Sequence, residues 1–416
     1  MVSMANRALL DLLASVKRPA LLLVGAIALI LAGPSLASHH PVFSGKGSVV
    51  GNPNAGRIYV LDSKRSFEHG EVLVISPTEM RVERRIPTGY RPDFVVSPDG
   101  TRLFVTSTEG PPQVGTLVVI DPISGTVVDR QVLPDRMMYT VMPTLPTLVA
   151  SAKGRWVFVG KDRWTPSDAL GSYYQEDKYT LAAYDARQGI LSKKDVAISE
   201  DCDGMHLVPS PSRLYVICSS QNSVYSYPMT DDGLGSPQVI GLPRNPRQVF
   251  DGSLDTTAVT TPVYPAIAGG VLSADESILT VFTSYLRAIQ IDISTGRIVR
   301  VEQVVDDRWA LPNGVISSPD GSRIYVAVGP VSSLNMGPGA DEILVLNSES
   351  LAQVGNIRPA SPVWSPAVSK DGQYLFVLAP KAQTLYVIDT TTGLEVSRMT
   401  DFADLPTRVA TALSPE

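Results

Sequence analysis

The sequence is poor in the residues that usually perform catalysis or bind metals. Its 416 residues include two cysteines and four histidines: His39, His40, His69 and His206. No spacing among them matches a zinc, haem or calcium site. No nucleophile elbow, phosphate-binding loop or dinucleotide fingerprint occurs either. These absences argue against a self-contained metalloenzyme or nucleotide-dependent enzyme, whereas an acid–base pair assembled from distant segments stays open.

Positive charge is also in short supply. The chain has 35 lysines and arginines against 41 aspartates and glutamates, a net charge of −6. Without residues 1–37 the balance becomes 32 against 40, or −8. Such a chain does not attract a phosphate backbone. We therefore exclude nucleic acid as a partner.

Long hydrophobic runs are limited to one, near the N-terminus. Arg7, Lys17 and Arg18 precede an apolar stretch that leads to Gly33-Pro34 and to small residues at Ser35 and Ala37. This order predicts a signal peptide, residues 1–37, cleaved before Ser38. The alternative is an uncleaved anchor, which would be the only attachment to a membrane. Because no second such run follows, we expect a soluble domain exported to the periplasm.

What the sequence does have is a repeat. Turns resembling Ser-Pro-Asp-Gly precede runs of β-branched and aromatic residues, and they begin at Ser97, Ser151, Ser210, Ser273, Ser318, Ser369 and Ser414. Successive turns are 54, 59, 63, 45, 51 and 45 residues apart, near the roughly 40–50 residues of a four-stranded propeller blade. The pattern predicts an all-β protein, a seven-bladed β-propeller, with residues 38–416 as its single domain.

The order of strands within the repeat also predicts how the ring closes. The first complete repeat resolves into strands A to D at residues 93–97, 102–106, 116–121 and 126–131. Strands at 57–61, 71–76 and 81–86 lack an A strand before them, whereas an A strand at 408–413 has no strands after it. We expect the C-terminal strand to complete the N-terminal sheet, which removes two open edges.

Alternating strands give the ring two unlike faces. The turn face carries the A–B turns at Ser97, Ser318 and Ser369, whose aspartates and glycines are typical of turn chemistry. The loop face carries the longer connections, at residues 63–70, 133–145, 161–179, 242–265 and 329–341. Large apolar residues gather there: Phe67, Met137, Met138, Tyr139, Trp164, Tyr173, Tyr174, Tyr264 and Trp309. Such a surface suits a protein partner or a small-ligand pocket, or else plugs the ring.

The two cysteines, Cys202 and Cys218, are close in sequence. In an oxidising compartment an even count at short separation favours a disulfide, with two buried thiols as the alternative. Since A and B strands are adjacent, we expect the two sulfur atoms within bonding distance.

One protein family resembles this chain over most of its length, the heavy chains of methylamine dehydrogenases. Their Asp-Cys motif with a nearby histidine, followed after a short strand by a second, bridged cysteine, is similar to Asp201, Cys202, His206 and Cys218. Three further segments are similar: residues 57–62, residues 145–147 leading to 156–158, and residues 264–266 leading to 291–296.

The resemblance implies a non-catalytic heavy subunit of a periplasmic amine dehydrogenase. It would carry no cofactor and would bind a small, cysteine-rich light subunit bearing a tryptophan-derived quinone. The pair would oxidise a primary amine and pass electrons to a copper protein or a cytochrome. A phenylalanine after the first strand lines the substrate channel in this family, and Phe67 is the nearest match.

Two alternatives remain at this stage. A free-standing exported propeller of the YVTN-repeat type, acting as a protein- or ligand-binding module, is supported by Leu103-Phe104-Val105-Thr106 and by the regular later repeats. A propeller lactonase would need acids, arginines or a metal converging at the pore, and no fixed spacing supplies them.

Overall fold

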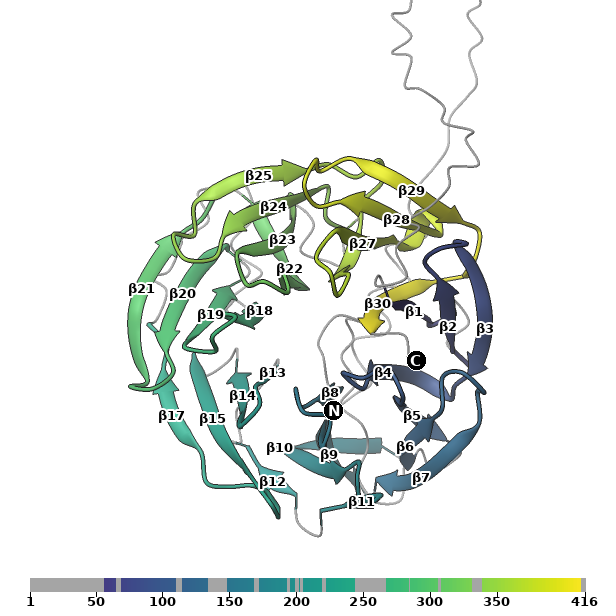
Figure 1. Cartoon of the computed structure of the whole chain (residues 1–416). Coiled ribbons are helices and arrows are strands. Elements are labelled where there is room, and N and C mark those ends of the chain that lie inside the picture. The colour runs from purple at the N-terminus through teal and green to yellow at the C-terminus, as the bar shows by residue number, and fades with distance from the viewer. Residues whose placement is uncertain are drawn as a thin grey trace, which may run out of the picture. The chain divides into compact units, whose positions relative to one another are not determined.

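The computed structural model shows the repeat unit by unit (Figure 1). The chain divides into two units, and every described residue belongs to the second, Gly47–Glu416. The structure describes residues 56–64, 69–109, 114–133, 148–167, 172–192, 195–198, 202, 205–218, 222–243, 267–283, 285–305, 308–330 and 339–412. The predicted signal peptide, its cleavage site and Phe67 lie outside these ranges.

The described residues form seven antiparallel sheets arranged as a ring of blades. Innermost strand first, the early blades are β4 (Tyr90–Val96), β5 (Leu103–Glu109), β6 (Val114–Ile120) and β7 (Val127–Leu133); β8 (Leu148–Ala150), β9 (Trp156–Ser167), β10 (Ser172–Asp185), β11 (Ile190–Leu191) and β12 (Val196–Ala197); and β13 (Met205–Pro209), β14 (Arg213–Cys218), β15 (Ser223–Thr230), β16 (Gly233–Leu234) and β17 (Gln238–Gly241). The later blades are β18 (Ile267–Leu272), β19 (Ile278–Thr283), β20 (Arg287–Asp292) and β21 (Arg297–Gln303); β22 (Arg308–Ser317), β23 (Arg323–Pro330), β24 (Glu342–Asn347) and β25 (Gln353–Ile357); and β26 (Trp364–Val368), β27 (Tyr374–Ala379), β28 (Thr384–Asp389) and β29 (Glu395–Thr400), with a short 3-10 helix at Pro380–Ala382.

The seventh sheet closes the ring as predicted. It runs in the order β3 (Arg81–Pro87), β2 (Glu71–Ser76), β1 (Arg57–Asp62) and β30 (Pro406–Ala412). Strands β1 and β30 pair antiparallel, with Val60 opposite Val409. The N-terminal and C-terminal segments therefore share one hydrogen-bonded ladder.

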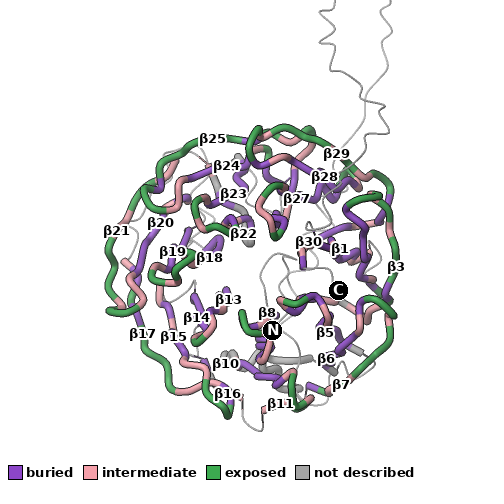
Figure 2. Tube along the Cα trace, viewed as in Figure 1, coloured by how far each residue is buried: buried purple, intermediate pink, exposed green. Residues whose placement is uncertain are grey.

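The hydrophobic core is divided into clusters between neighbouring blades. Strands in the middle of each blade, such as β1 and β27, are buried along nearly their whole length, whereas outer strands such as β3 and β29 are mostly exposed (Figure 2). Each of the seven clusters among the described residues contains side chains from two adjacent sheets. The cluster at the closure of the ring joins β27 and β28 to β1 and β2. Neighbouring blades therefore cover both faces of each described sheet along its inner strands.

The A–B turns follow the predicted turn chemistry. In the turn at Ser318, the serine hydroxyl donates to the Asp320 carboxylate at 2.5 Å and accepts from the Arg323 amide at 3.0 Å. The turns at Ser97, Ser273 and Ser369 repeat this arrangement. These acids stabilise turns, as the sequence indicates.

One predicted connection is wrong. Residues 161–179 were expected to form a long loop, but β9 and β10 continue through them, paired from Trp156–Asp185 out to Ser167–Ser172. A register shift lies between Glu176 and Tyr179. Consequently Trp164, Tyr173 and Tyr174 lie on strands, and Trp309 lies within β22. A backbone ladder can extend a hairpin where side chains show no hydrophobic alternation, which is the signal the interpretation relied on.

Neighbouring A–B turns contact each other, and a pair of glycines tests that contact. Gly321 and Gly372 both have positive φ, 68° and 74°. A Cβ on Gly321 would lie 2.4 Å from Ala274 Cβ and 2.8 Å from its backbone nitrogen, whereas one on Gly372 would lie 3.5 Å from Pro319 Cδ. We expect Gly372→Ala to lower the free energy of unfolding by about 1 kcal/mol from backbone strain alone. Gly321→Ala should cost about 3 kcal/mol, because two blades must separate.

Denaturant titration of the two variants measures the difference. Equal losses would show that the turns do not constrain one another.

Candidate functional site

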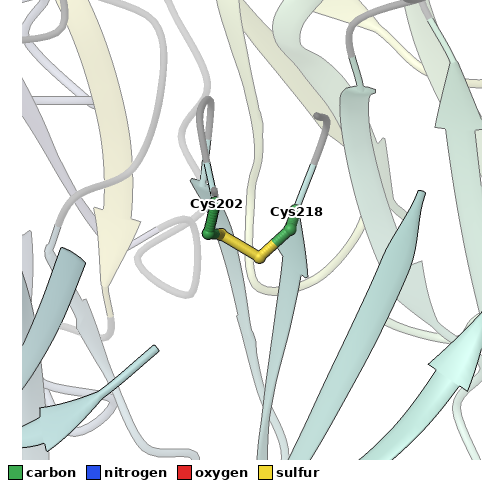
Figure 3. Close-up of a disulfide and its surroundings, with 2 residues drawn as sticks. All are labelled: Cys202 and Cys218. Carbon is green, nitrogen blue, oxygen red and sulfur yellow. A yellow bond between two sulfur atoms is a disulfide. The ribbon is translucent and has the colours of Figure 1, made fainter. Parts of the chain in front are cut away.

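The Cys202–Cys218 disulfide is formed (Figure 3). It lies at the loop face, because Cys218 is the last residue of β14. Both residues are fully buried, and their Cα atoms are 5.0 Å apart. Cys218 ends β14, where it is paired with Met205, so Cys202 precedes β13 rather than lying on it. The predicted bond is present, but the reason given for it needs correction. The bond ties the segment entering a blade to its second strand, instead of joining two paired strand positions.

His206 packs against the next blade. It lies on β13 and is only 6% exposed. A Cβ on Gly269 of β18 would lie 3.7 Å from His206 Cε1 and 3.1 Å from Val315 Cβ. The imidazole therefore occupies a packed position between its own blade and the next one. Across the described residues, no group of three His, Cys, Asp or Glu side chains is placed to hold a metal ion.

Asp62 is a buried charge at the loop face, at the closure of the ring. The backbone amides of Asp404 and Leu405 donate to its carboxylate at 3.0 and 2.8 Å, and Lys64 Nζ donates at 2.7 Å. Burial raises the pKa of this carboxyl, but the hydrogen bonds from Lys64 and the two amides outweigh it and hold the pKa below its ordinary 3.8. Lys64 also pairs with Glu71, which accepts from Arg85 at 2.8 Å.

Three further ion pairs lie at the same face, two of them made by one arginine. Lys161 of β9 is fully buried and pairs with Asp195 beside β12. Arg308, the first residue of β22, donates to Asp341 at 2.5 Å and to Glu342 at 3.3 Å. Since each of these acids has a basic partner, the described part of the loop face is a balanced, hydrogen-bonded surface rather than a field of one sign.

An acid and an arginine also meet between innermost strands. Arg408 of β30 pairs with Asp93 of β4, and its guanidinium lies 5.7 Å from the ring centroid of Phe94. These residues are 315 positions apart, so no local spacing could have signalled the pair. The charged groups at Asp62, Lys161 and Arg308 were likewise missed. Asp62 and Arg308 have one sequence signal, a charge at the loop-face end of a strand, whereas Lys161 lies in the middle of β9 and has none.

Comparison with known proteins establishes the fold class. No protein-family model matches the chain, and no curated protein matches it in sequence. Among solved structures, it is similar to a functionally unknown protein from Desulfotomaculum acetoxidans, with 15% identity and a TM-score of 0.57 over 86% of this chain and 99% of that one. A putative 6-phosphogluconolactonase from Bacteroides fragilis gives 11% identity and a TM-score of 0.57, over 86% and 99%.

A third similar structure is a dihydro-heme d1 dehydrogenase in complex with DHE, with 18% identity and a TM-score of 0.53 over 88% of this chain and 76% of that one. At such identities the likeness shows the fold alone: this chain is a seven-bladed β-propeller. No helix in the described ranges has the length and apolar character needed to span a bilayer.

Proposed function

We propose that this chain is the non-catalytic heavy subunit of a quinone-dependent amine dehydrogenase. The observation that carries the proposal is the Cys202–Cys218 disulfide, because these cysteines belong to the Asp-Cys motif on which the family resemblance rests. A propeller that closes through β1 and β30 provides the rigid scaffold that such a subunit requires. In this proposal the chain is exported through residues 1–37 and acts in the periplasm, where disulfides persist.

The loop face is the proposed docking surface for a small, cysteine-rich light subunit. It presents partly exposed ion pairs, such as Arg308 with Asp341, that are suited to the polar rim of an interface. The quinone would reside in the light subunit, and a copper protein or cytochrome would receive its electrons. The role of this chain is to position that subunit and to line the path of the amine, with Phe67 at the path.

Co-purification tests the assembly directly. The full chain, tagged at the C-terminus, is expressed together with the reading frames adjacent to its own in an export-competent bacterium. We expect a small cysteine-rich protein with quinone absorbance to co-purify and to oxidise primary amines in the presence of an artificial electron acceptor. A monomer that carries no quinone and is inert towards amines would contradict this and favour the YVTN-type binding module.

A substitution tests the role of Phe67 in the complex. Phe67→Ala should change KM for amines several-fold, because an aromatic wall of the channel is removed, while the complex still assembles. His69→Ala is the matched control, since His69 is an exposed residue of the same connection. If both variants behave alike, Phe67 does not line the channel.

A further inference from the structure

A cavity of about 510 Å³ opens on the turn face, opposite the proposed docking surface. Its walls come from the turn-face ends of five innermost strands, β13, β18, β22, β26 and β30. Leu272, Ile316, Pro366 and Val409 provide apolar surface, and Glu276 and Lys370 provide the charges. A volume of this order is typical of sites for small molecules.

Glu276 occupies a position where the other turns carry glycine. It is the fourth residue of the turn at Ser273, and its φ is +57°. At the same position Gly100, Gly154, Gly321 and Gly372 have φ between 67° and 74°. Glu276 makes the same hydrogen bond from its amide to the first serine, at 2.9 Å. A side chain is therefore held in a left-handed conformation that glycine adopts without strain, and such outliers collect at binding sites.

Lys370 is a second departure from the repeat, at the other side of the cavity. It is the second residue of the turn at Ser369, where Pro98, Ala274 and Pro319 stand in other turns. Proline and alanine at this position contact the neighbouring turn, as Ala274 contacts Gly321. Lysine replaces that compact contact residue with an exposed cation at the cavity wall.

The two charges are separated within the cavity. The turn that joins β22 to β23 lies between the Glu276 turn and the Lys370 turn in the order of blades. Among the described residues, neither Glu276 nor Lys370 forms an ion pair with the other or with a third side chain. An anion and a cation thus line one cavity from two different turns, with a third turn between them.

We propose that this cavity binds a linear zwitterion, a molecule with an ammonium group at one end, a carboxylate at the other and a methylene or peptide chain between them. Glu276 accepts from the ammonium and Lys370 donates to the carboxylate, as charge-assisted hydrogen bonds. The apolar wall between them covers the chain. Because a whole blade separates the two charged turns, an α-amino acid, whose charges are on adjacent carbons, does not reach both.

Calorimetric titration of the full-length chain tests the proposal with four probes: 6-aminohexanoate, hexylamine, hexanoate and glycine. A tripeptide, trialanine, then distinguishes a peptide source from a free ω-amino acid. We expect 6-aminohexanoate or trialanine to bind about five- to tenfold more tightly than the singly charged probes and glycine. Glu276→Gln should weaken zwitterion binding to the level of hexanoate, and Lys370→Met to that of hexylamine.

Glu276→Gly separates binding from folding. Since glycine relieves the left-handed strain, this variant should unfold at an equal or higher denaturant concentration than the wild type while losing the same affinity as Glu276→Gln. The proposal would be overturned if 6-aminohexanoate and trialanine bound no more tightly than hexylamine and hexanoate. It would also be overturned if the variants bound 6-aminohexanoate and trialanine as tightly as the wild type does. The proposed docking of a light subunit at the loop face does not depend on either result.

Discussion

Replacing Asp62 with alanine is expected to lower the free energy of unfolding by about 3 kcal/mol. The substitution leaves the amides of Asp404 and Leu405 without their acceptor and removes one of the two acidic partners of Lys64. These contacts join β1 to the segment that enters β30. Among the described residues, the sheet that holds β1 and β30 is the only one built from both ends of the chain. The variant should therefore open at the closure of the ring before other blades unfold.

The effect depends on pH in a defined direction. The folded-state pKa of Asp62 is lower than the ordinary 3.8, so its contribution is complete above that value and is lost as pH falls through the folded-state pKa. The difference in the free energy of unfolding between wild type and Asp62→Ala should thus be largest at about pH 7 and smaller at about pH 3. Urea titrations at both values measure it, and hydrogen exchange of β1 and β30 locates it.

Asp232→Ala is the matched control for Asp62→Ala. Asp232 is an exposed acid in a turn between β15 and β16, and its loss should change stability by about 0.5 kcal/mol or less. Similar losses for both variants would mean that Asp62 does not hold the ring closed.

Removing the disulfide is expected to have a comparable effect. Cys202 and Cys218 are 16 positions apart, and a crosslink over a loop of that size contributes about 3 kcal/mol, largely by restricting the unfolded chain. The paired substitution Cys202→Ser and Cys218→Ser should lose this amount in guanidinium titrations. Both sulfur atoms belong to the cluster shared with Trp156 and Tyr227, so the loss should extend to the neighbouring blade.

Reduction of the wild-type protein provides the internal control. In the wild type, a reductant should lower the free energy of unfolding by the same amount as the double substitution does. In the double variant, a reductant should leave the free energy of unfolding unchanged. A reductant-insensitive wild type would show that the cysteines are free in the purified protein.

The strands were predictable because each repeat contains local sequence signals for them. A serine turn with aspartate and glycine fixes where A ends and B begins, and runs such as Leu103-Phe104-Val105 have the composition of buried strands. The observed β1, β2 and β3 agree with the predicted ranges to within a residue. The outer half of the β9–β10 hairpin was missed, because it lacks alternation and is held by backbone bonds.

The sites were predictable only in part. The cysteine pair could be inferred because two cysteines at short separation, in a chain expected from its sequence to be exported, have few other uses. The departure of Glu276 from glycine was also visible in the repeat, but its meaning needed the observed φ and the cavity. The pairs Asp93–Arg408 and Lys161–Asp195 had no local signal.

The sequence by itself determined the number of blades, the phase of their strands and the way the ring closes. All three follow from short-range turn and strand preferences repeated seven times. Tertiary structure alone decided which charges meet, since closure brings Asp93 beside Arg408 across 315 positions. It also decided that a cavity lies on the turn face, because a cavity is bounded by strands from five blades. Packing between repeats, which no single repeat encodes, determines both.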